Sequence, residues 1–210
     1  MAEGIVLQIQ KEALDDSVDI ETLLRKAYLA ARKLQLKDFE AWISCEQNGY
    51  TENIPKYRII GGEIKAWNPY HGWIPVVLQG KAADALNHMH LSFPISTILD
   101  TYKNSNGSVA FSVSGALTEY LNNTTDGFIT KYSFHSTKTE LKKIISAVRN
   151  RILEWSLLLE ENDIIGEGLG FSDTEIKTAR ESQVINNYTN NFYSTAENTQ
   201  IQQGGSENQQ

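Results

Sequence analysis

The chain has 210 residues, of which 40% are hydrophobic, and 19 basic against 26 acidic residues give a net charge of −7. This composition suffices for one hydrophobic core, and the negative charge disfavours nonspecific binding to nucleic-acid phosphates or anionic membranes. The single cysteine, Cys45, excludes an internal disulfide and a zinc site made of several cysteines. Because we find neither a signal-peptide pattern nor an apolar run of about 18 residues, we expect a cytoplasmic protein without membrane association.

Helices are predicted for most of the first 50 residues. Apolar residues recur at helical spacing over 3–15 and form a clearer stripe over 20–34, which follows Asp19, a favourable N-cap. A third helix is predicted over 38–48. It ends at Gly49, because glycine accepts a left-handed conformation without strain.

A β-hairpin is predicted next. The stretch NPYHG, residues 68–72, separates two extended segments, and its Pro and Gly favour a tight turn. Pro75 cannot donate a backbone hydrogen bond, which indicates an edge strand or a bulge. We expect Trp67 and Trp73 to flank the turn and to pack on the helical layer, against the helix that contains Trp42.

The tip of this hairpin contains the exposed candidates. Asn68 is expected to hydrogen-bond the backbone of its own turn. Tyr70 and His71 are expected at the tip, where they are available to a partner. A structural role for the turn and a recognition role both remain open.

The following residues predict alternating helices and strands. Helices are expected over 81–91, 94–103 and 115–122, and strands over 108–113 and 128–135. Ser114 is placed to cap the short helix, and Thr137 and Glu140 match a capping box.

A long helix over 138–161 is the strongest prediction. Its apolar residues alternate at spacings of three and four, which favours packing along the domain core, with coiled-coil association as the alternative. Basic residues along this helix, Arg149 included, predict a solvated face.

The composition changes after residue 161. Residues 162–181 are acidic and contain several glycines, as a linker would, and residues 182–210 are rich in Asn and Gln. Such a β-prone tail is expected either to be disordered or to pair strands with copies of itself. The candidates for oligomerisation are Ile185, Tyr188, Phe192, Tyr193 and Ile201. The prediction is therefore an α+β fold over 1–161, with a helical N-terminal layer on a small antiparallel sheet and a long C-terminal helix. The linker and the Asn- and Gln-rich, β-prone tail follow this domain.

Few residues suggest catalysis. Glu63-x-Lys65 is the short end of a metal-nuclease pattern, but no aspartate lies on the preceding strand. His88 and His90 stand two apart on a predicted helix, where their side chains diverge by about 200° and cannot share one metal ion. We therefore predict no catalytic residue, no metal site and no cofactor.

Several short motifs resemble the AbiTii domain of bacterial abortive-infection proteins. They are Leu23-Leu24-Arg25-Lys26-Ala27, Phe39-Glu40-x-Trp42-Ile43, Glu46-x-Asn48-Gly49-Tyr50, Pro55-x-Tyr57-Arg58 and Asn68-Pro69-Tyr70-x-Gly72-Trp73-x-Pro75. The resemblance implies antiviral defence that stops phage propagation, often at the expense of the infected cell. It implies no catalytic mechanism.

The functional hypothesis is a non-enzymatic defence protein that acts by recognition or regulation and assembles into homo-oligomers. A phage or host protein is the expected partner, and nucleic acid is not expected. The alternatives are a metal-dependent nuclease acting at Glu63 and Lys65, or a toxin directed at a host or phage protein. Candidate partner-binding residues are Arg58, Asn68, Tyr70 and His71. Candidate structural motif residues are Trp42, Gly49, Tyr50, Tyr57, Trp67, Pro69, Gly72, Trp73 and Pro75.

Overall fold

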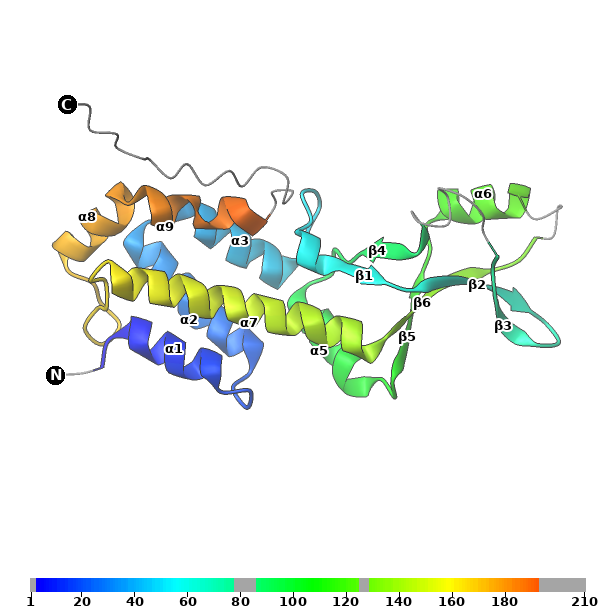
Figure 1. Cartoon of the computed structure of the whole chain (residues 1–210), viewed down its shortest axis with the longest axis horizontal. Helices are drawn as coiled ribbons and strands as arrows, with labels where there is room; N and C mark the ends of the chain where they lie inside the picture. The colour runs from blue at the N-terminus through cyan, green and yellow to red at the C-terminus, as the bar shows by residue number, and fades with distance from the viewer. Residues whose placement is uncertain (1–2, 78–85, 125–128, 193–210) are drawn as a thin grey trace, which may run out of the picture.

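The computed structural model describes residues 3–77, 86–124 and 129–192. Helices gather at one end of an elongated molecule, and a small sheet extends from the other end (Figure 1). The predicted α+β fold, with a helical N-terminal layer, a small antiparallel sheet and a long C-terminal helix, is confirmed. Within the described ranges, no helix is long and apolar enough to cross a membrane.

The helical part is organised around one long helix, α7, which packs against α1, α2 and α5 (Figure 1). Helix α2 also contacts α3 and α8. The helices are α1 (Ile5–Leu14), α2 (Ile20–Leu34), α3 (Lys37–Asn48), α5 (Ile95–Asn104), α6 (Gly115–Thr124), α7 (Lys138–Glu161), α8 (Asp173–Glu181) and α9 (Gln183–Asn187), with 3-10 turns η1 (Lys56–Arg58) and η2 (Tyr188–Phe192).

The periodic patterns of the sequence are reproduced in these helices. The stripe of α7 is buried at Leu141, Val148, Ile152 and Trp155, so the interpretation as a core helix is confirmed. Periodic apolar positions specify such a helix because one face must be removed from water.

Local capping of two helices also follows the sequence. The side chain of Asp19 accepts hydrogen bonds from the backbone N–H groups of Glu21 and Thr22, which begins α2. The hydroxyl of Ser114 accepts a hydrogen bond from the N–H of Leu117 in α6, at 3.2 Å. Both predictions are confirmed. A cap stabilises the start of a helix because it satisfies N–H groups that have no partner within the helix.

The sheet has four antiparallel strands in the order β3-β2-β6-β5. Its strands are β2 (Glu63–Asn68), β3 (Gly72–Pro75), β5 (Ser108–Ser112) and β6 (Tyr132–Thr137). Strand β3 is an edge strand, as Pro75 predicted. A separate two-stranded ribbon pairs β1 (Ile59–Gly61) with β4 (His88–His90).

Two local predictions are wrong. Residues His88–His90 form strand β4 rather than part of a helix, because backbone pairing with the remote strand β1 determines their conformation; residues 81–85 of the predicted helix lie outside the described part. Thr137 makes no side-chain cap at the start of α7, and Glu140 instead accepts a hydrogen bond from the backbone N–H of Gly61, at 3.3 Å. Both differences come from contacts between distant segments.

The chain after α7 is folded onto the helices as far as Phe192. The segment 162–181, expected to be a linker, contains α8, which is capped by a reciprocal box between Ser172 and Glu175. Residues 183–192, expected to be β-prone, form α9 and η2. They are helical here because their apolar side chains pack on α3 and α7.

Candidate functional site

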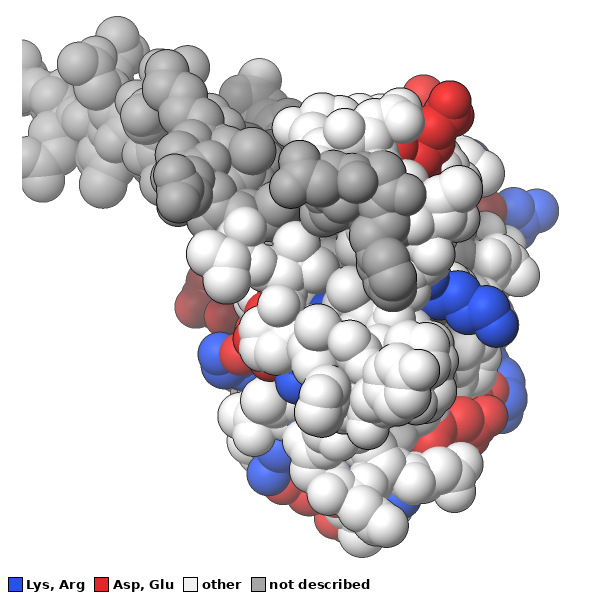
Figure 2. All heavy atoms as spheres, turned by 90° about the vertical axis from the view of Figure 1, so that its right-hand side faces the viewer, with Lys and Arg blue, Asp and Glu red and all other residues white. Residues whose placement is uncertain are grey.

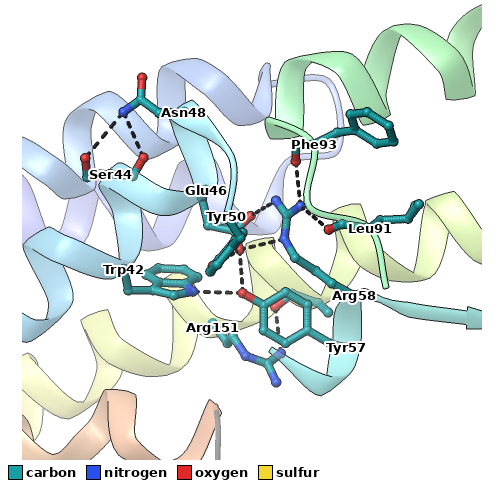
Figure 3. A network of polar contacts seen from close by, with 11 residues as sticks. Trp42, Ser44, Glu46, Asn48, Tyr50, Tyr57, Arg58, Leu91, Phe93 and Arg151 are labelled. Atoms are coloured by element: carbon teal, nitrogen blue, oxygen red, sulfur yellow. Dashed lines mark hydrogen bonds and ion pairs between the residues drawn. The ribbon is translucent and has the colours of Figure 1, made fainter. Parts of the chain in front are cut away.

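The motif residues of the sequence converge on one buried carboxylate. Glu46, on α3, is fully buried, and its Oε1 accepts hydrogen bonds from the hydroxyls of Tyr50 (2.6 Å) and Tyr57 (2.5 Å). Oε1 also accepts from Nε of Arg58 at 3.0 Å, and Oε2 accepts from its Nη2 at 2.6 Å (Figure 3). We call Glu46, Tyr50, Tyr57 and Arg58 the Glu46 cluster. A charge-assisted, bidentate pair of this kind fixes both position and orientation.

Arg58 connects the helical part to the segment that follows β4. Its Nη1 donates to the backbone carbonyls of Leu91 (3.1 Å) and Phe93 (2.7 Å), on the side away from Glu46 (Figure 3). The side chain of Arg58 has no exposed surface. The prediction that Arg58 contacts a partner is therefore wrong, because every direction of its guanidinium is used inside the protein.

Two further motif residues, Trp42 and Gly49, support the Glu46 cluster. The indole N–H of Trp42 donates to the hydroxyl of Tyr57 at 2.8 Å. Gly49 ends α3 with φ of +93°, and a Cβ at this position would lie 2.8 Å from the carbonyl oxygen of Ser92. Glycine is required here both by the backbone conformation and by this close approach.

The tyrosines and the arginine of the Glu46 cluster each keep one protonation state near neutral pH. Burial raises the pKa of the Tyr50 and Tyr57 hydroxyls, and the Glu46 charge raises it further, so both remain proton donors. Burial lowers the pKa of Arg58, but its hydrogen bonds and attraction to Glu46 outweigh this and raise it overall. Groups that keep one protonation state near neutral pH suit a structural joint better than proton transfer.

The hairpin between β2 and β3 carries the exposed candidates. Asn68 pairs with Gly72, and Oδ1 of Asn68 accepts the backbone N–H groups of Tyr70 (2.9 Å) and His71 (3.1 Å). The predicted hydrogen bonds of Asn68 are confirmed. The side chain of Tyr70 is 91% exposed and His71 is exposed, so their location at the tip is also confirmed.

The expected packing of Trp67 and Trp73 on the helical layer is wrong. The two rings contact each other edge to face, with 5.4 Å between centroids, and are 41% and 38% exposed. Strands β2 and β3 extend away from the helices (Figure 1). The Trp42 ring instead contacts the rings of Phe39 and Phe192. The sheet, rather than the helical layer, therefore supports the hairpin.

The end of the molecule that carries this hairpin is mostly uncharged. Figure 2 views it from this end, and the described acidic and basic side chains lie mainly around its margin. Large apolar side chains exposed here include Trp67, Tyr70, Trp73, Ile74 and Tyr120. Exposed apolar patches of this kind are typical of interaction surfaces.

Three of the predicted oligomerisation residues belong to the intramolecular core. Ile185 and Phe192 are 3% and 5% exposed, and Phe192 meets the Trp42 ring edge to face at 5.2 Å. The hydroxyl of Tyr188 donates to the backbone carbonyl of Arg151 at 2.9 Å. The prediction that Ile185 and Phe192 join subunits is wrong, because the chain buries them itself, whereas Tyr188 is half-buried. Tyr193 and Ile201 lie outside the described residues.

The predicted solvated basic face of α7 does not include Arg149. Its guanidinium is buried and donates to the backbone carbonyls of Glu12, Asp15 and Val18, at 2.9, 3.0 and 2.6 Å. These carbonyls lie at and beyond the end of α1, where unpaired acceptors and the helix dipole favour a cation.

Among the described residues, the fold brings only His135, as an additional candidate ligand, beside the Glu63 and Lys65 of the nuclease alternative. Glu63 pairs with Lys65 at 3.0 Å, and His135 lies opposite Glu63 on β6. Across the described ranges, no three His, Cys, Asp or Glu side chains are grouped as a metal site would require. Cys45 is half-buried on α3.

Together these features define a helical domain with an appended antiparallel sheet, joined by the Glu46 cluster and bearing an exposed aromatic hairpin. Residues 4–184 match the AbiTii family, and the chain belongs to it. Membership implies a role in abortive-infection, antiphage defence. No curated protein and no solved structure matches the chain. Sequence reasoning missed Glu46 as the centre of the motif, although a carboxylate on the apolar face of a helix is itself a signal for a buried cation.

Proposed function

We propose that the protein acts in antiphage defence by binding a phage or host protein through the tip of its hairpin, Tyr70 and His71, together with the exposed ring of Trp67. The main support is the exposure of Tyr70 on a turn that Asn68 already holds in shape. A preorganised loop loses little conformational entropy on binding, and exposed aromatic side chains frequently contribute most of the binding energy.

The Glu46 cluster supports the same proposal indirectly. Its charges are neutralised internally and its tyrosines stay protonated, so it offers no group for proton transfer. Its role is to hold the segment before β1 and the segment after β4 against the helices. The proposed setting is the cytoplasm of a bacterium, where a lone thiol such as Cys45 stays reduced.

A double substitution at the tip, Tyr70→Ser with His71→Ser, tests the proposal in cells exposed to phage. Loss of an aromatic anchor of about 2 kcal/mol weakens binding by roughly 30-fold, so protection against plaque formation should largely disappear. The control is Leu14→Ser, which changes a side chain that is 73% exposed on α1, away from the hairpin. Full protection by a tip variant whose melting temperature is unchanged would refute the proposal.

Self-association is a second part of the proposal and concerns the Asn- and Gln-rich sequence after Phe192. Truncation after residue 192 leaves α9 and η2 in the chain, whereas truncation after residue 161 would remove core side chains such as Ile185. The molecular mass of both the full chain and the 1–192 chain should be measured by light scattering. A smaller assembly for 1–192 supports association through the tail, and equal masses contradict it.

A further inference from the structure

One face of the four-stranded sheet gathers aromatic, basic and hydroxyl side chains. The alternation of β2 places Lys65 and Trp67 on the same face, and the register adds Trp73 opposite Trp67 and Ser133 opposite Lys65. Ser112 lies opposite Ser133 on β5. Lys131 joins them, because its carbonyl accepts the backbone N–H of Trp67 at 2.9 Å. We call this set the open face.

A surface hollow of about 370 Å³ lies beside Trp73 on the open face. Seven described residues line it, and they comprise two aromatic residues, one lysine and four Ser or Thr residues: Trp73, Tyr132, Lys131, Ser112, Ser133, Thr118 and Thr130. Binding sites for small molecules have volumes of about 300–1,000 Å³. The hollow is therefore large enough for one planar heterocycle and its substituents.

Three hydroxyl groups of this hollow are left with free acceptor positions. These three donate their protons to backbone carbonyls: Ser133 to Phe111 (3.0 Å), Thr130 to Trp67 (2.6 Å) and Thr118 to Ser114 (3.0 Å). A hydroxyl has one proton and two lone pairs, so each oxygen that has given its proton can still accept. A ligand that brings N–H donors therefore fits these three oxygens.

Trp73 and Lys131 indicate which other chemical groups the ligand carries. Trp73 is 38% exposed, and the flat face of a tryptophan stacks on nucleobases of any sequence. Lys65 is paired with Glu63, but the exposed Lys131 has no acidic partner among the described residues and can meet a phosphate. The overall charge of −7 argues against broad phosphate binding, but it does not weaken a site built on stacking.

We propose that the hollow beside Trp73 binds a nucleotide whose base carries an exocyclic amino group. The base stacks on Trp73, its amino group donates to the Ser133, Thr130 or Thr118 oxygens, and Lys131 contacts the phosphate. The same chemistry is present in a free nucleotide and in single-stranded nucleic acid. This inference does not depend on the proposed contact of Tyr70 with a protein, because Tyr70 does not line the hollow.

Binding is measured on the full chain by quenching of tryptophan fluorescence with AMP and UMP, and by anisotropy of labelled oligo(A) and oligo(U) of 15 nucleotides. AMP or oligo(A) should bind, and the matching uridine probe should bind at least fivefold more weakly. Trp73→Ala should weaken binding about 5- to 150-fold, the range expected for loss of one stacked base, whereas Trp73→Phe should retain most of it. Lys131→Met, an exposed change that leaves the fold intact, should weaken binding and its salt dependence.

The control variant is Tyr70→Ser, which should bind these probes as the unmodified protein does. Binding of AMP without oligo(A) identifies a free nucleotide as the ligand, and binding of oligo(A) identifies a single strand; both support the site. The proposal is overturned if no probe binds saturably at millimolar concentration, if uridine and adenosine probes bind equally, or if folded Trp73→Ala and Lys131→Met bind as tightly as the unmodified protein. If the variant with Tyr70→Ser and His71→Ser no longer protects cells but still binds AMP, that result bears on the proposed protein contact and not on the nucleotide site.

Discussion

Replacement of Glu46 by glutamine removes the buried negative charge while it keeps the shape of the side chain. Arg58 remains charged, because a guanidinium is not deprotonated in proteins and because it still contacts the carbonyls of Leu91 and Phe93. Both side chains of the pair have zero exposure, so no water is available to solvate the remaining charge. The hydroxyls of Tyr50 and Tyr57 also lose a charged acceptor.

Removal of one partner of a buried ion pair costs about 3–5 kcal/mol of folding free energy. For a chain of this size, each kcal/mol lowers the melting temperature by about 2–4 °C, so Glu46→Gln should lower it by about 6–20 °C. The exposed pair of Arg25 with Glu21 provides a matched control, with side chains 65% and 36% exposed. Arg25→Gln should cost less than about 1 kcal/mol, because water and salt screen exposed pairs.

Urea denaturation followed by circular dichroism gives these free energies. A double variant, Glu46→Leu with Arg58→Met, removes both charges and should lose less stability than the sum of the two single variants, with a coupling of about 0.5–3 kcal/mol. If Glu46→Gln costs no more than Arg25→Gln, or if the single effects add, the ion pair is not what joins the helices to the segment after β4.

Two other positions give independent predictions. The Glu175 carboxylate accepts hydrogen bonds from backbone N–H groups of the 165–172 loop; burial raises its pKa, but these bonds outweigh burial and lower it. Because the folded pKa is lowered, its stabilisation is complete above about pH 4.3 and is lost as the pH falls further. Glu175→Gln should therefore lower the free energy of unfolding by about 1–3 kcal/mol at pH 7, and by less at pH 3. Urea titrations at both pH values measure this loss, and an equal loss at the two pH values contradicts the prediction. Gly49→Ala should cost about 1–3 kcal/mol of folding free energy, because it adds a Cβ 2.8 Å from the Ser92 carbonyl oxygen at a residue with positive φ. If the melting temperature of this variant stays within about 1 °C of that of the unmodified protein, the backbone relaxes and this reasoning is wrong.

Local patterns in the sequence were sufficient for the helices α1, α2, α3, α5, α6 and α7 and for the hairpin turn. Helical hydrogen bonds join residues four apart, so spacing and caps within one segment determine where a helix such as Lys138–Glu161 begins and ends. The turn at Asn68 is equally local, because the side chain bonds the backbone of the two residues beyond Pro69. The family motifs likewise identified the residues of the Glu46 cluster without placing them together.

The partners of those residues were decided by the tertiary structure. Strand His88–His90 exists because it pairs with Ile59–Gly61, and Phe192 is buried because Trp42 lies beneath it. Trp67 and Trp73 remain exposed because their strands continue past the helices that were expected to cover them. Periodicity shows which side chains must be removed from water, but which distant segment covers them depends on how all the segments pack. For this reason the sequence determined most of the helices and the hairpin turn, whereas the fold determined strand β4, the helices after α7 and which side chains are left exposed.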